Sequence, residues 1–416
     1  MNRYGLLGEK LTHSFSPLIH KMLGNYEYGL YEKTCSEVEN FLKNGDFKGL
    51  NVTIPYKKTV IPYLSSLSDT AKYTGSVNTI IRTDDGSLYG DNTDVYGFLR
   101  MVGHSGISVD GKKALVLGSG GASASVVSAL MALNAEPHII SRNGENNYEN
   151  LYLHYDAEII VNTTPLGMYP DTGVSPVDLS HFKKLSGVFD LIYNPARTAL
   201  LLQAEKLGIP YENGLYMLVA QAKKSAELFM GHEISDMETD RIYRTLNLSL
   251  QNIILIGMPG AGKSTVAKEI EELTGRKSLD SDNEITKRLG NTPKELLEKV
   301  GEPAFRMIES DIIRDLGKKS GVIISTGGGV VVNDSNYDLL HQNGVIVWLQ
   351  RSLDRLSYDD RPLLKKSGAK ELYQKRKDRY QRFADAVVTN GDDVKESALD
   401  VLKAVYGGIL YEVTGY

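Results

Sequence analysis

The sequence has too few cysteines for a disulfide, because Cys35 is the only cysteine among its 416 residues. A single thiol cannot form an intrachain bridge, which excludes a small secreted scaffold held together by disulfides. The first 20 residues lack an uninterrupted apolar stretch behind a basic start, and no run of about 18 apolar residues occurs elsewhere. We therefore expect a cytoplasmic protein without a membrane partner.

The sequence also lacks a strong excess of charge of either sign, since its formal net charge is -5. Residues 1–245 hold 22 basic and 27 acidic side chains, and residues 246–416 hold 25 of each, so neither part resembles a nucleic-acid-binding domain. The segment from Arg351 to Arg382 nevertheless holds 11 basic and 5 acidic residues. Such a local positive field suits a phosphorylated ligand, although a solvated helix face would have the same composition.

Short apolar runs that are typical of buried strands alternate with helical patterns along the chain. The strand-like runs lie at residues 114–117, 159–161, 253–256, 322–324 and 345–349, and helical patterns lie at 122–133 and 265–273. This alternation predicts parallel βα units and an α/β fold. Glycine-rich turns follow two of the strands about 140 residues apart, too far for one nucleotide site. We therefore expect two nucleotide-binding domains with a boundary near Leu248.

The first glycine-rich turn lies in the sequence ALVLGSGGASASVVSAL, residues 114–130, between a strand and a helix. Glycines there let the backbone approach a pyrophosphate that sits at the helix N-terminus. The next strand ends in Ser141, Arg142 and Asn143, where an NAD-selective fold would place an acidic residue. Because an arginine can contact a 2′-phosphate, this position favours NADP.

Four polar strings precede this turn: HSFSP with Ser14 and Ser16, GLNVTIPYK ending at Lys57, GSVNT with Asn78, and GDNTD ending at Asp94. Each residue taken singly is typical of a turn or a helix cap. Together they supply hydroxyls, an amide, an ammonium and a carboxylate. This set is what a site needs to hold a polyhydroxy acid and to move a proton.

With VNTTPLGM from Val161 and ENGLYMLVAQ from Glu212, these strings resemble the shikimate dehydrogenase family over residues 1 to about 245. The resemblance implies NADPH-dependent reduction of 3-dehydroshikimate to shikimate, with Lys57 and Asp94 as the catalytic pair. It implies substrate binding by Ser14, Ser16, Thr53, Asn78, Tyr193 and Gln221. It implies cofactor binding by Gly118, Gly120, Gly121, Ala122, Ser141, Arg142, Asn143 and Gly214. The turn continues with Ala124 and Ser125 where family members often carry Arg-Gly, which weakens the NADP preference but leaves Arg142.

The second turn, GMPGAGKST at residues 257–265, fits the phosphate-binding pattern G-x-x-x-x-G-K-[ST] after an apolar strand and before a helix. In this pattern the loop backbone holds the phosphates, the lysine bridges the β- and γ-phosphates, and the following hydroxyl reaches Mg²⁺. The pattern predicts ATP and Mg²⁺ as ligands. The residues concerned are Gly260, Ala261, Gly262, Lys263, Ser264 and Thr265.

Further motifs follow this loop: LDSD with Asp280 and Asp282 on an extended segment, EPAFRMIES with Arg306 and Glu309, STGGG with glycines 327–329, and DRPLL with Arg361. Structural alternatives are a helix N-cap for Asp282 and a surface ion pair between Arg306 and Glu309. In combination the motifs resemble shikimate kinase over residues 250 to about 407. The resemblance implies that Asp280 and Ser264 hold Mg²⁺ and that Asp282 accepts the proton of the attacking hydroxyl. It implies further that Arg306, Gly328 and Arg376 bind shikimate, that a lid carries Arg361, and that Arg355 stacks on adenine.

We thus predict a bifunctional enzyme whose first product is its second substrate. Residues 1–247 would form the dehydrogenase, with a substrate lobe (1–103 and 214–247) and a Rossmann-type NADP lobe (104–213). Residues 248–416 would form a P-loop domain of the nucleoside monophosphate kinase type. One alternative is a quinate-oxidising, NAD-using dehydrogenase fused to another small-molecule kinase, and a second is a nucleotide-sensing regulatory protein. The expected partners are small-molecule substrates, and the sequence leaves the oligomeric state open.

Overall fold

The computed structural model describes residues 4–11, 14–356 and 368–407, and the chain divides into two compact units. The first unit comprises Met1–Gly167, Val174–Tyr193 and Leu200–Thr245, and the second comprises Met168–Gly173, Asn194–Ala199 and Leu246–Tyr416. Helix α8 (Asp236–Leu250) is continuous across the change of unit, so the predicted boundary near Leu248 falls inside a helix. Among the described residues, no helix is long and apolar enough to cross a membrane.

The first sheet of the first unit is mixed and has the strand order β2-β1-β3-β5-β6-β4. Its strands are β1 (Tyr4–Gly8), β2 (Tyr28–Glu32), β3 (Gly49–Val52), β4 (Ser66–Leu67), β5 (Thr79–Arg82) and β6 (Leu88–Asp91). Strand β1 is parallel to β2 and β3, whereas β5 is antiparallel to β3 and β6. Its helices are α1 (Ser16–Leu23), α2 (Cys35–Asn44), α3 (Asp69–Thr74) and α7 (Leu215–Met230).

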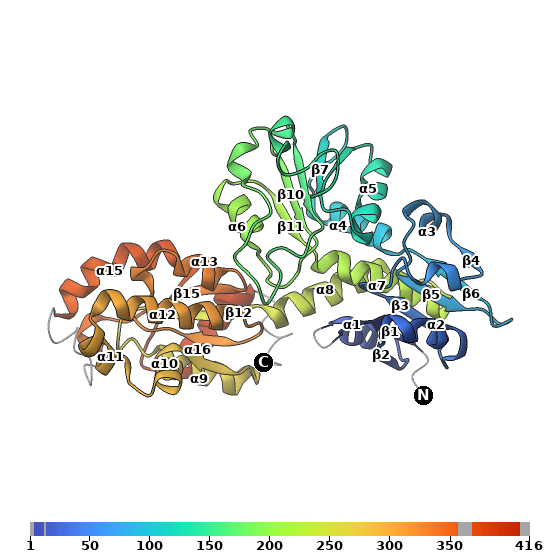
Figure 1. Cartoon of the computed structure of the whole chain (residues 1–416). Helices are drawn as coiled ribbons and strands as arrows, with labels where there is room; N and C mark the ends of the chain where they lie inside the picture. The colour runs from blue at the N-terminus through green and yellow to red at the C-terminus, as the bar shows by residue number, and fades with distance from the viewer. Residues whose placement is uncertain (1–3, 12–13, 357–367, 408–416) are drawn as a thin grey trace. The chain divides into compact units, whose positions relative to one another are not determined.

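The second sheet of this unit is entirely parallel, with the order β11-β10-β9-β7-β8. Its strands are β7 (Lys113–Leu117), β8 (Glu136–Ile140), β9 (Ile159–Asn162), β10 (Gly187–Asp190) and β11 (Tyr211–Asn213). Helices α4 (Asp94–Ser105) and α5 (Gly121–Ala132) cover one face, and α6 (Ala199–Lys206) covers the other (Figure 1). Because both faces are covered, the three central strands β7, β9 and β10 are apolar at most positions, as β7 illustrates with Leu115 and Val116 in opposite cores.

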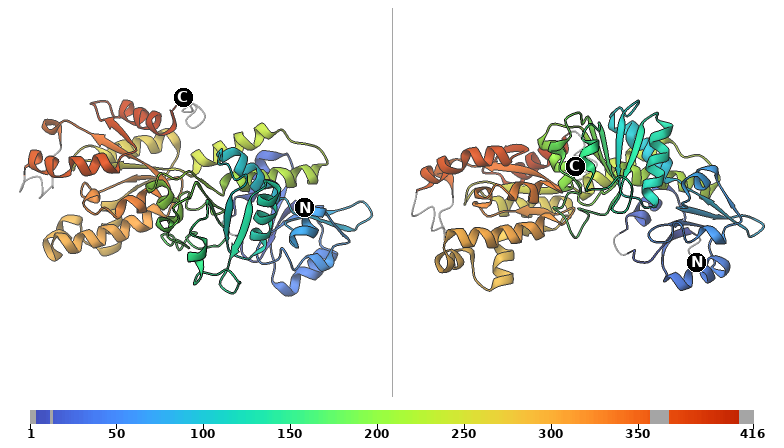
Figure 2. Two further views of the ribbon diagram at one scale, coloured as in Figure 1. Left: turned by 90° about the horizontal axis from the view of Figure 1, so that it is seen from above. Right: turned by 45° about the horizontal axis from the view of Figure 1, so that its top comes forward.

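The second unit is built around a third, parallel sheet of order β13-β14-β12-β15-β16. Its strands are β12 (Asn252–Ile256), β13 (Ser278–Asp280), β14 (Ile323–Ser325), β15 (Gly344–Gln350) and β16 (Ala386–Thr389). Helices α9 (Lys263–Thr274) and α16 (Val394–Tyr406) pack on one face, as the views in Figure 2 show. The other face is covered by α10 (Ser281–Leu289), α11 (Pro293–Val300), α12 (Glu302–Gly317), α13 (Asn336–His341) and α15 (Ala369–Phe383).

The described residues also include single-turn 3-10 helices at Ile61–Tyr63, Leu151–His154, Leu179–His181, Val330–Val332 and Leu353–Arg355. Within the second unit, the short segment 194–199 is hydrogen-bonded to the residues that precede β15. The Arg197 side chain donates to the carbonyl of His341 at 2.7 Å, and the Ala196 backbone N–H donates to the Asn343 amide oxygen at 2.8 Å. The predicted α/β class with two nucleotide-type parallel sheets is confirmed.

Candidate functional site

Lys57 on the loop after β3, Asn78 immediately before β5 and Asp94 at the first position of α4 lie close together. The Lys57 ammonium lies 2.6 Å from one Asp94 carboxylate oxygen, and the Asn78 amide donates to the other at 2.8 Å. The Lys57 and Asp94 side chains are 18% and 8% exposed, so water screens their ion pair little. The geometry supplies an ammonium that can donate a proton and a carboxylate that fixes its direction.

The polar residues expected around this ion pair form two contact groups. The Asn78 amide also lies 3.5 Å from the Gln221 amide oxygen on α7. Ser14 and Ser16 form the second group, in which their hydroxyls are 3.2 Å apart and Phe15 between them packs on Tyr193 with ring centroids 5.6 Å apart. Burial raises the pKa of Tyr193, which therefore stays a neutral donor. Thr53 directly follows β3, on the same loop as Lys57.

The glycine turn between β7 and α5 lies against the Lys57 loop. Gly118 has a φ of +109°, which favours glycine, and Gly120 is the N-cap of α5. A Cβ placed on Gly121 would lie 3.0 Å from the Ser76 hydroxyl and 3.7 Å from a carbon of the Lys57 side chain. The N-terminus of α5, with backbone N–H groups and no side chain on its cap, is thus next to the proposed proton donor.

The remaining predicted cofactor residues lie at the same edge of this sheet. Ser141, Arg142 and Asn143 directly follow β8, the strand beside β7, and Arg142 is exposed. Gly214 is the N-cap of α7, where a Cβ would lie only 2.0 Å from the Leu191 carbonyl oxygen. Close backbone packing therefore requires glycine at position 214, whatever its contact with a ligand.

Glu212 is the middle residue of β11 and belongs to the same ENGLYMLVAQ segment as Gly214. Its side chain is 13% exposed. Its carboxylate is 3.5 Å from the His104 ring, which stacks on Tyr216 with ring centroids 4.0 Å apart. Burial raises the pKa of Glu212 to about 7 from 4.5, against an opposing backbone hydrogen bond from Asn213. Between pH 4.5 and about pH 7, Glu212 is therefore protonated in the folded state and ionised in the unfolded state.

This shift predicts that the free energy of unfolding falls as the pH rises from about 4.5 to about 7, by about 3 kcal/mol from this group. Glu212→Gln should remove that dependence, because the amide does not ionise. Urea unfolding followed by circular dichroism at pH 5 and pH 8 checks it. The pH-dependent loss in the natural chain should exceed that in the variant, and equal losses would contradict the prediction.

In the second unit, the predicted phosphate loop connects β12 to α9. Gly257, Gly260 and Gly262 all have positive φ angles, of +146°, +82° and +89°. The Lys263 ammonium donates to the carbonyls of Gly257 and Met258, both at 3.0 Å, so the side chain lies along the loop. The exposed Ser264 hydroxyl donates to the Asp280 carboxylate at 2.7 Å. This hydroxyl and carboxylate are oxygen donors of the type that Mg²⁺ prefers.

Asp280 also caps the next helix, which corrects the expected extended conformation of Asp282 and the structural alternative that Asp282 is the N-cap. Its other carboxylate oxygen accepts from the backbone N–H groups of Asp282 and Asn283 at 3.0 and 3.1 Å. The N-cap of α10 is therefore Asp280 rather than Asp282, and only Asp280 of the two is in extended conformation. The first helical turn leaves the Asp282 carboxylate beside the glycines that follow β14.

The second group of predicted kinase residues converges on Gly327, Gly328 and Gly329. A Cβ on Gly327 would lie 2.8 Å from the Asp282 carboxylate, and one on Gly329 would lie 2.1 Å from the Arg306 guanidinium. The Arg376 guanidinium donates to the Gly328 carbonyl at 2.9 Å. Three charged side chains thus pack against this glycine segment, and at Gly327 and Gly329 any side chain would clash with Asp282 or Arg306.

Glu309 forms an ion pair with the Arg306 guanidinium. The two are 2.8 Å apart on one face of α12, and their side chains are 2% and 11% exposed, so the alternative of a surface ion pair is wrong. Burial raises the pKa of the Glu309 carboxyl, and the adjacent Arg306 guanidinium opposes that shift.

Arg361 lies outside the described residues. Arg355, expected to stack on adenine, is exposed and forms two hydrogen bonds to the Asp392 carboxylate at 2.9 and 3.0 Å.

Sequence reasoning missed two residues that contact the phosphate loop. The Asn390 amide donates to the Ala261 carbonyl at 2.6 Å, and the Arg351 guanidinium is 3.6 Å from the position of a Cβ on Gly262. They directly follow β16 and β15. Ligands of α/β sheets bind at the carboxyl ends of strands, so a search of strand ends would have found both.

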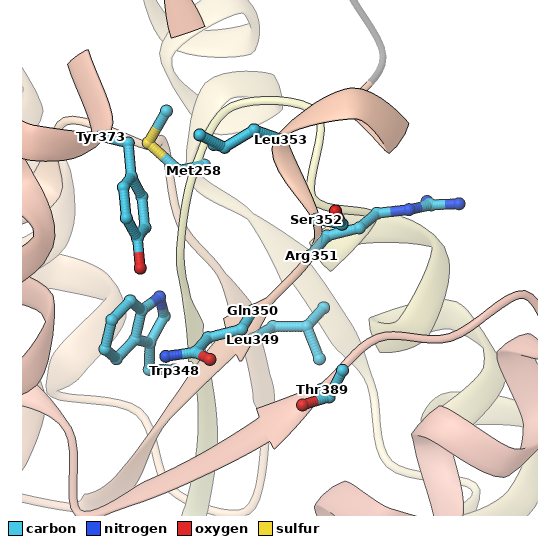
Figure 3. A pocket seen from close by; sticks show the side chains of 9 residues that line it. All are labelled: Met258, Trp348, Leu349, Gln350, Arg351, Ser352, Leu353, Tyr373 and Thr389. Carbon is cyan, nitrogen blue, oxygen red and sulfur yellow. The ribbon is translucent and has the colours of Figure 1, made fainter. Parts of the chain in front are cut away.

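A cavity of about 250 Å³ adjoins the loop at Met258. Its wall is formed by Met258, Trp348, Leu349, Gln350, Arg351, Ser352, Leu353, Tyr373 and Thr389. Figure 3 shows the Tyr373 hydroxyl pointing toward the Trp348 indole, while the Arg351 guanidinium points away from both rings. The aromatic side chains of Tyr373 and Trp348 therefore lie on one side of the cavity, and the Arg351 side chain lies on the other.

Comparison with known proteins gives matches for both units. The family model for the shikimate dehydrogenase substrate binding domain matches residues 6–80, and the shikimate kinase model matches residues 259–406. A shikimate dehydrogenase (NADP(+)) of Clostridium perfringens is 36% identical over 268 residues, which are 59% of this chain and 98% of the relative.

Solved structures agree. Shikimate dehydrogenase 1 of Peptoclostridium difficile has a TM-score of 0.56 and 38% identity, covering 59% of this chain and 98% of that one. Shikimate 5-dehydrogenase of Thermus thermophilus, solved with NADP(H) and shikimate, has a TM-score of 0.54 and 29% identity, covering 59% and 99%. The chain therefore belongs to the shikimate dehydrogenase family and continues into a shikimate kinase domain, which makes it a bifunctional enzyme of the shikimate pathway.

Proposed function

We propose that residues 1–247 reduce 3-dehydroshikimate to shikimate with NADPH and that residues 248–416 phosphorylate shikimate at its 3-hydroxyl with ATP. The observation that carries the first assignment is the Lys57–Asp94 ion pair, 2.6 Å long, beside the glycine turn of the parallel sheet. The product of one reaction is the substrate of the other. This relation supports the two assignments together.

In the first reaction, Lys57 would protonate the C3 oxygen and Asp94 would orient its ammonium. Reduction of a ketone leaves negative charge on that oxygen. A cation with a transferable proton lowers the barrier by stabilising this charge and by donating the proton that neutralises it. The substrate carboxylate and hydroxyls would be held by Ser14, Ser16, Thr53, Asn78, Tyr193 and Gln221. Gly214, at the N-cap of α7, would contact the cofactor beside this substrate.

NADPH, when bound, would supply the hydride. The turn residues Gly118, Gly120, Gly121 and Ala122 fit its pyrophosphate, because the N-terminus of α5 presents backbone N–H groups without a capping side chain. Ser141, Arg142 and Asn143 would hold the adenosine 2′-phosphate. The exposed cation at position 142 favours NADP over the NAD-dependent alternative.

In the second reaction, Asp282 would accept the proton of the attacking hydroxyl while Arg306, Gly328 and Arg376 hold shikimate. The phosphates of ATP would lie on residues 260–265, with Lys263 moving from its carbonyl contacts to the β- and γ-phosphates. Ser264 and Asp280 would hold Mg²⁺, which neutralises phosphate charge when bound. Arg361 would add a further positive charge.

A regulatory protein that only senses nucleotide would bind Mg²⁺ with its nucleotide but would not need a proton-transfer pair. The chain keeps the Lys57–Asp94 pair at hydrogen-bond distance. This pair favours turnover in the first unit over sensing.

The test incubates the purified full chain with 3-dehydroshikimate, NADPH, ATP and Mg²⁺ and identifies products by mass. We expect shikimate 3-phosphate, and shikimate alone when ATP is omitted. A parallel arm supplies quinate and NAD to test the alternative substrate. Absence of shikimate 3-phosphate from the complete mixture would refute the two-step function.

A further inference from the structure

A buried serine that no motif singled out lies beneath the proposed dehydrogenase site. Ser225 is on α7, one turn after Gln221, and its side chain is fully buried. Its hydroxyl is 2.8 Å from the Asn51 amide nitrogen, 2.8 Å from the Thr79 hydroxyl and 3.0 Å from the Thr93 hydroxyl, and it can donate to the Gln221 carbonyl at 3.0 Å. A hydroxyl donates once and accepts twice, so these neighbours saturate it.

The two threonines beside Ser225 decide which way the Asn78 amide faces. The amide oxygen of Asn78 accepts from the Thr93 backbone N–H at 2.8 Å and from the Thr79 hydroxyl at 3.0 Å. A backbone N–H can only donate. If the Asn78 amide were flipped, its NH₂ group would face the Thr93 N–H and two donors would oppose each other. The amide nitrogen must therefore face Asp94, to which it donates at 2.8 Å.

The same network reaches the other side of the lobe through Asn51. The Asn51 amide oxygen accepts from the Tyr28 hydroxyl at 2.7 Å, and Tyr28 stacks on His20 of α1 with ring centroids 4.0 Å apart. Burial lowers the pKa of His20 to about 3, against an opposing contact with Asn51, so its ring is neutral at physiological pH. The network therefore runs from α1, which begins at Ser16, to the Asp94 carboxylate without an unpaired buried charge.

We propose that Ser225 is a positioning residue for the dehydrogenase reaction, acting through Thr79 and Thr93 on Asn78 and thereby on the Lys57–Asp94 pair. The proposal rests on the proposed function of that pair. Buried networks of this kind hold a single arrangement only when every member is satisfied. Loss of the Ser225 hydroxyl removes the shared partner of the Asn51 amide and the two threonine hydroxyls, so the Thr79 hydroxyl can turn away from the Asn78 amide oxygen. The Thr93 backbone N–H still orients the Asn78 amide, but the position of that amide against Asp94 is then held less precisely.

The test compares the full chain with Ser225→Ala. We expect kcat for 3-dehydroshikimate reduction to fall about 10- to 100-fold, the scale of a small misplacement of a reacting group. The KM for NADPH should stay within about two-fold, and phosphorylation of supplied shikimate by the same chain should not change. A natural chain without dehydrogenase activity would instead refute the function itself, which separates the two failures.

Two further comparisons guard against a purely structural effect. Ser105→Ala removes a hydroxyl that bonds at the end of α4, away from the network, and should leave kcat unchanged. Thr79→Val replaces a network hydroxyl by a methyl group of similar size and should lower kcat, because its buried partners lose a hydrogen bond. Thr79→Ser keeps the hydroxyl and should retain at least half of the natural kcat. Ser225→Ala with natural kcat, or equal losses in both Thr79 variants, would overturn the proposal.

Discussion

Replacing Lys57 by alanine should reduce the rate of NADPH oxidation with 3-dehydroshikimate about 10²- to 10⁴-fold, the usual contribution of a positioned proton donor. The variant loses the ammonium 2.6 Å from Asp94 and leaves that carboxylate, 8% exposed, without its cation. Phosphorylation of supplied shikimate should continue at the natural rate, because Lys57 belongs to the first unit only. The two rates are measured on the same preparation by NADPH absorbance and by coupled ADP release.

The neighbouring lysine provides the matched control for this result. Lys58 is exposed, and removal of its charge in Lys58→Ala should change neither rate by more than about two-fold. If Lys57→Ala kept more than a tenth of the natural rate, another group would have to supply the proton. If it lost both activities while still folded, the two active sites would not be independent.

Replacing Lys263 by alanine should have the opposite effect. Phosphorylation of shikimate should fall about 10²- to 10³-fold, as for the loss of one preorganised cation at developing charge. Reduction of 3-dehydroshikimate should continue. Lys263→Met, which keeps part of the apolar stem, should show the same loss and separates the charge from the packing of this side chain, which is 7% exposed.

Trp348 shows whether these kinase variants are folded. It is the only tryptophan in the chain and is 3% exposed in the core of the second unit, so its emission reports that unit alone. Lys268→Ala, on the exposed face of α9, is the matched control. Natural phosphorylation by Lys263→Ala with an unchanged Trp348 spectrum would show that the phosphate loop is not the ATP site.

The two parallel sheets and the two glycine turns were predictable because their signals are local. A strand covered on both faces is apolar at nearly every residue, and a glycine turn between a strand and a helix occupies neighbouring positions. The cap at Asp280 was not predictable to the residue. Asp280 and Asp282 both suit a cap, and the choice depends on where β13 stops pairing with β14.

Site residues could be predicted where a motif contains them, but not where separate elements bring them together. Arg351 and Asn390 lie 39 positions apart and meet the phosphate loop only because β15 and β16 are neighbours in the sheet. Likewise, Ser225 has no sequence signal, since its partners come from β3, β5 and the loop before α4.

The sequence by itself determined the α/β class, the absence of disulfides and the positions of both glycine turns, because each follows from composition or from residues close in the chain. The family resemblance paired Lys57 with Asp94, but only the tertiary structure showed their contact. It alone decided that Asp282 and Arg306 meet the glycines after β14 and that Ser225 contacts Thr79 beside Asn78. These contacts join residues far apart in sequence. Their distances depend on strand order and on how helices pack over the sheets, which no local pattern encodes.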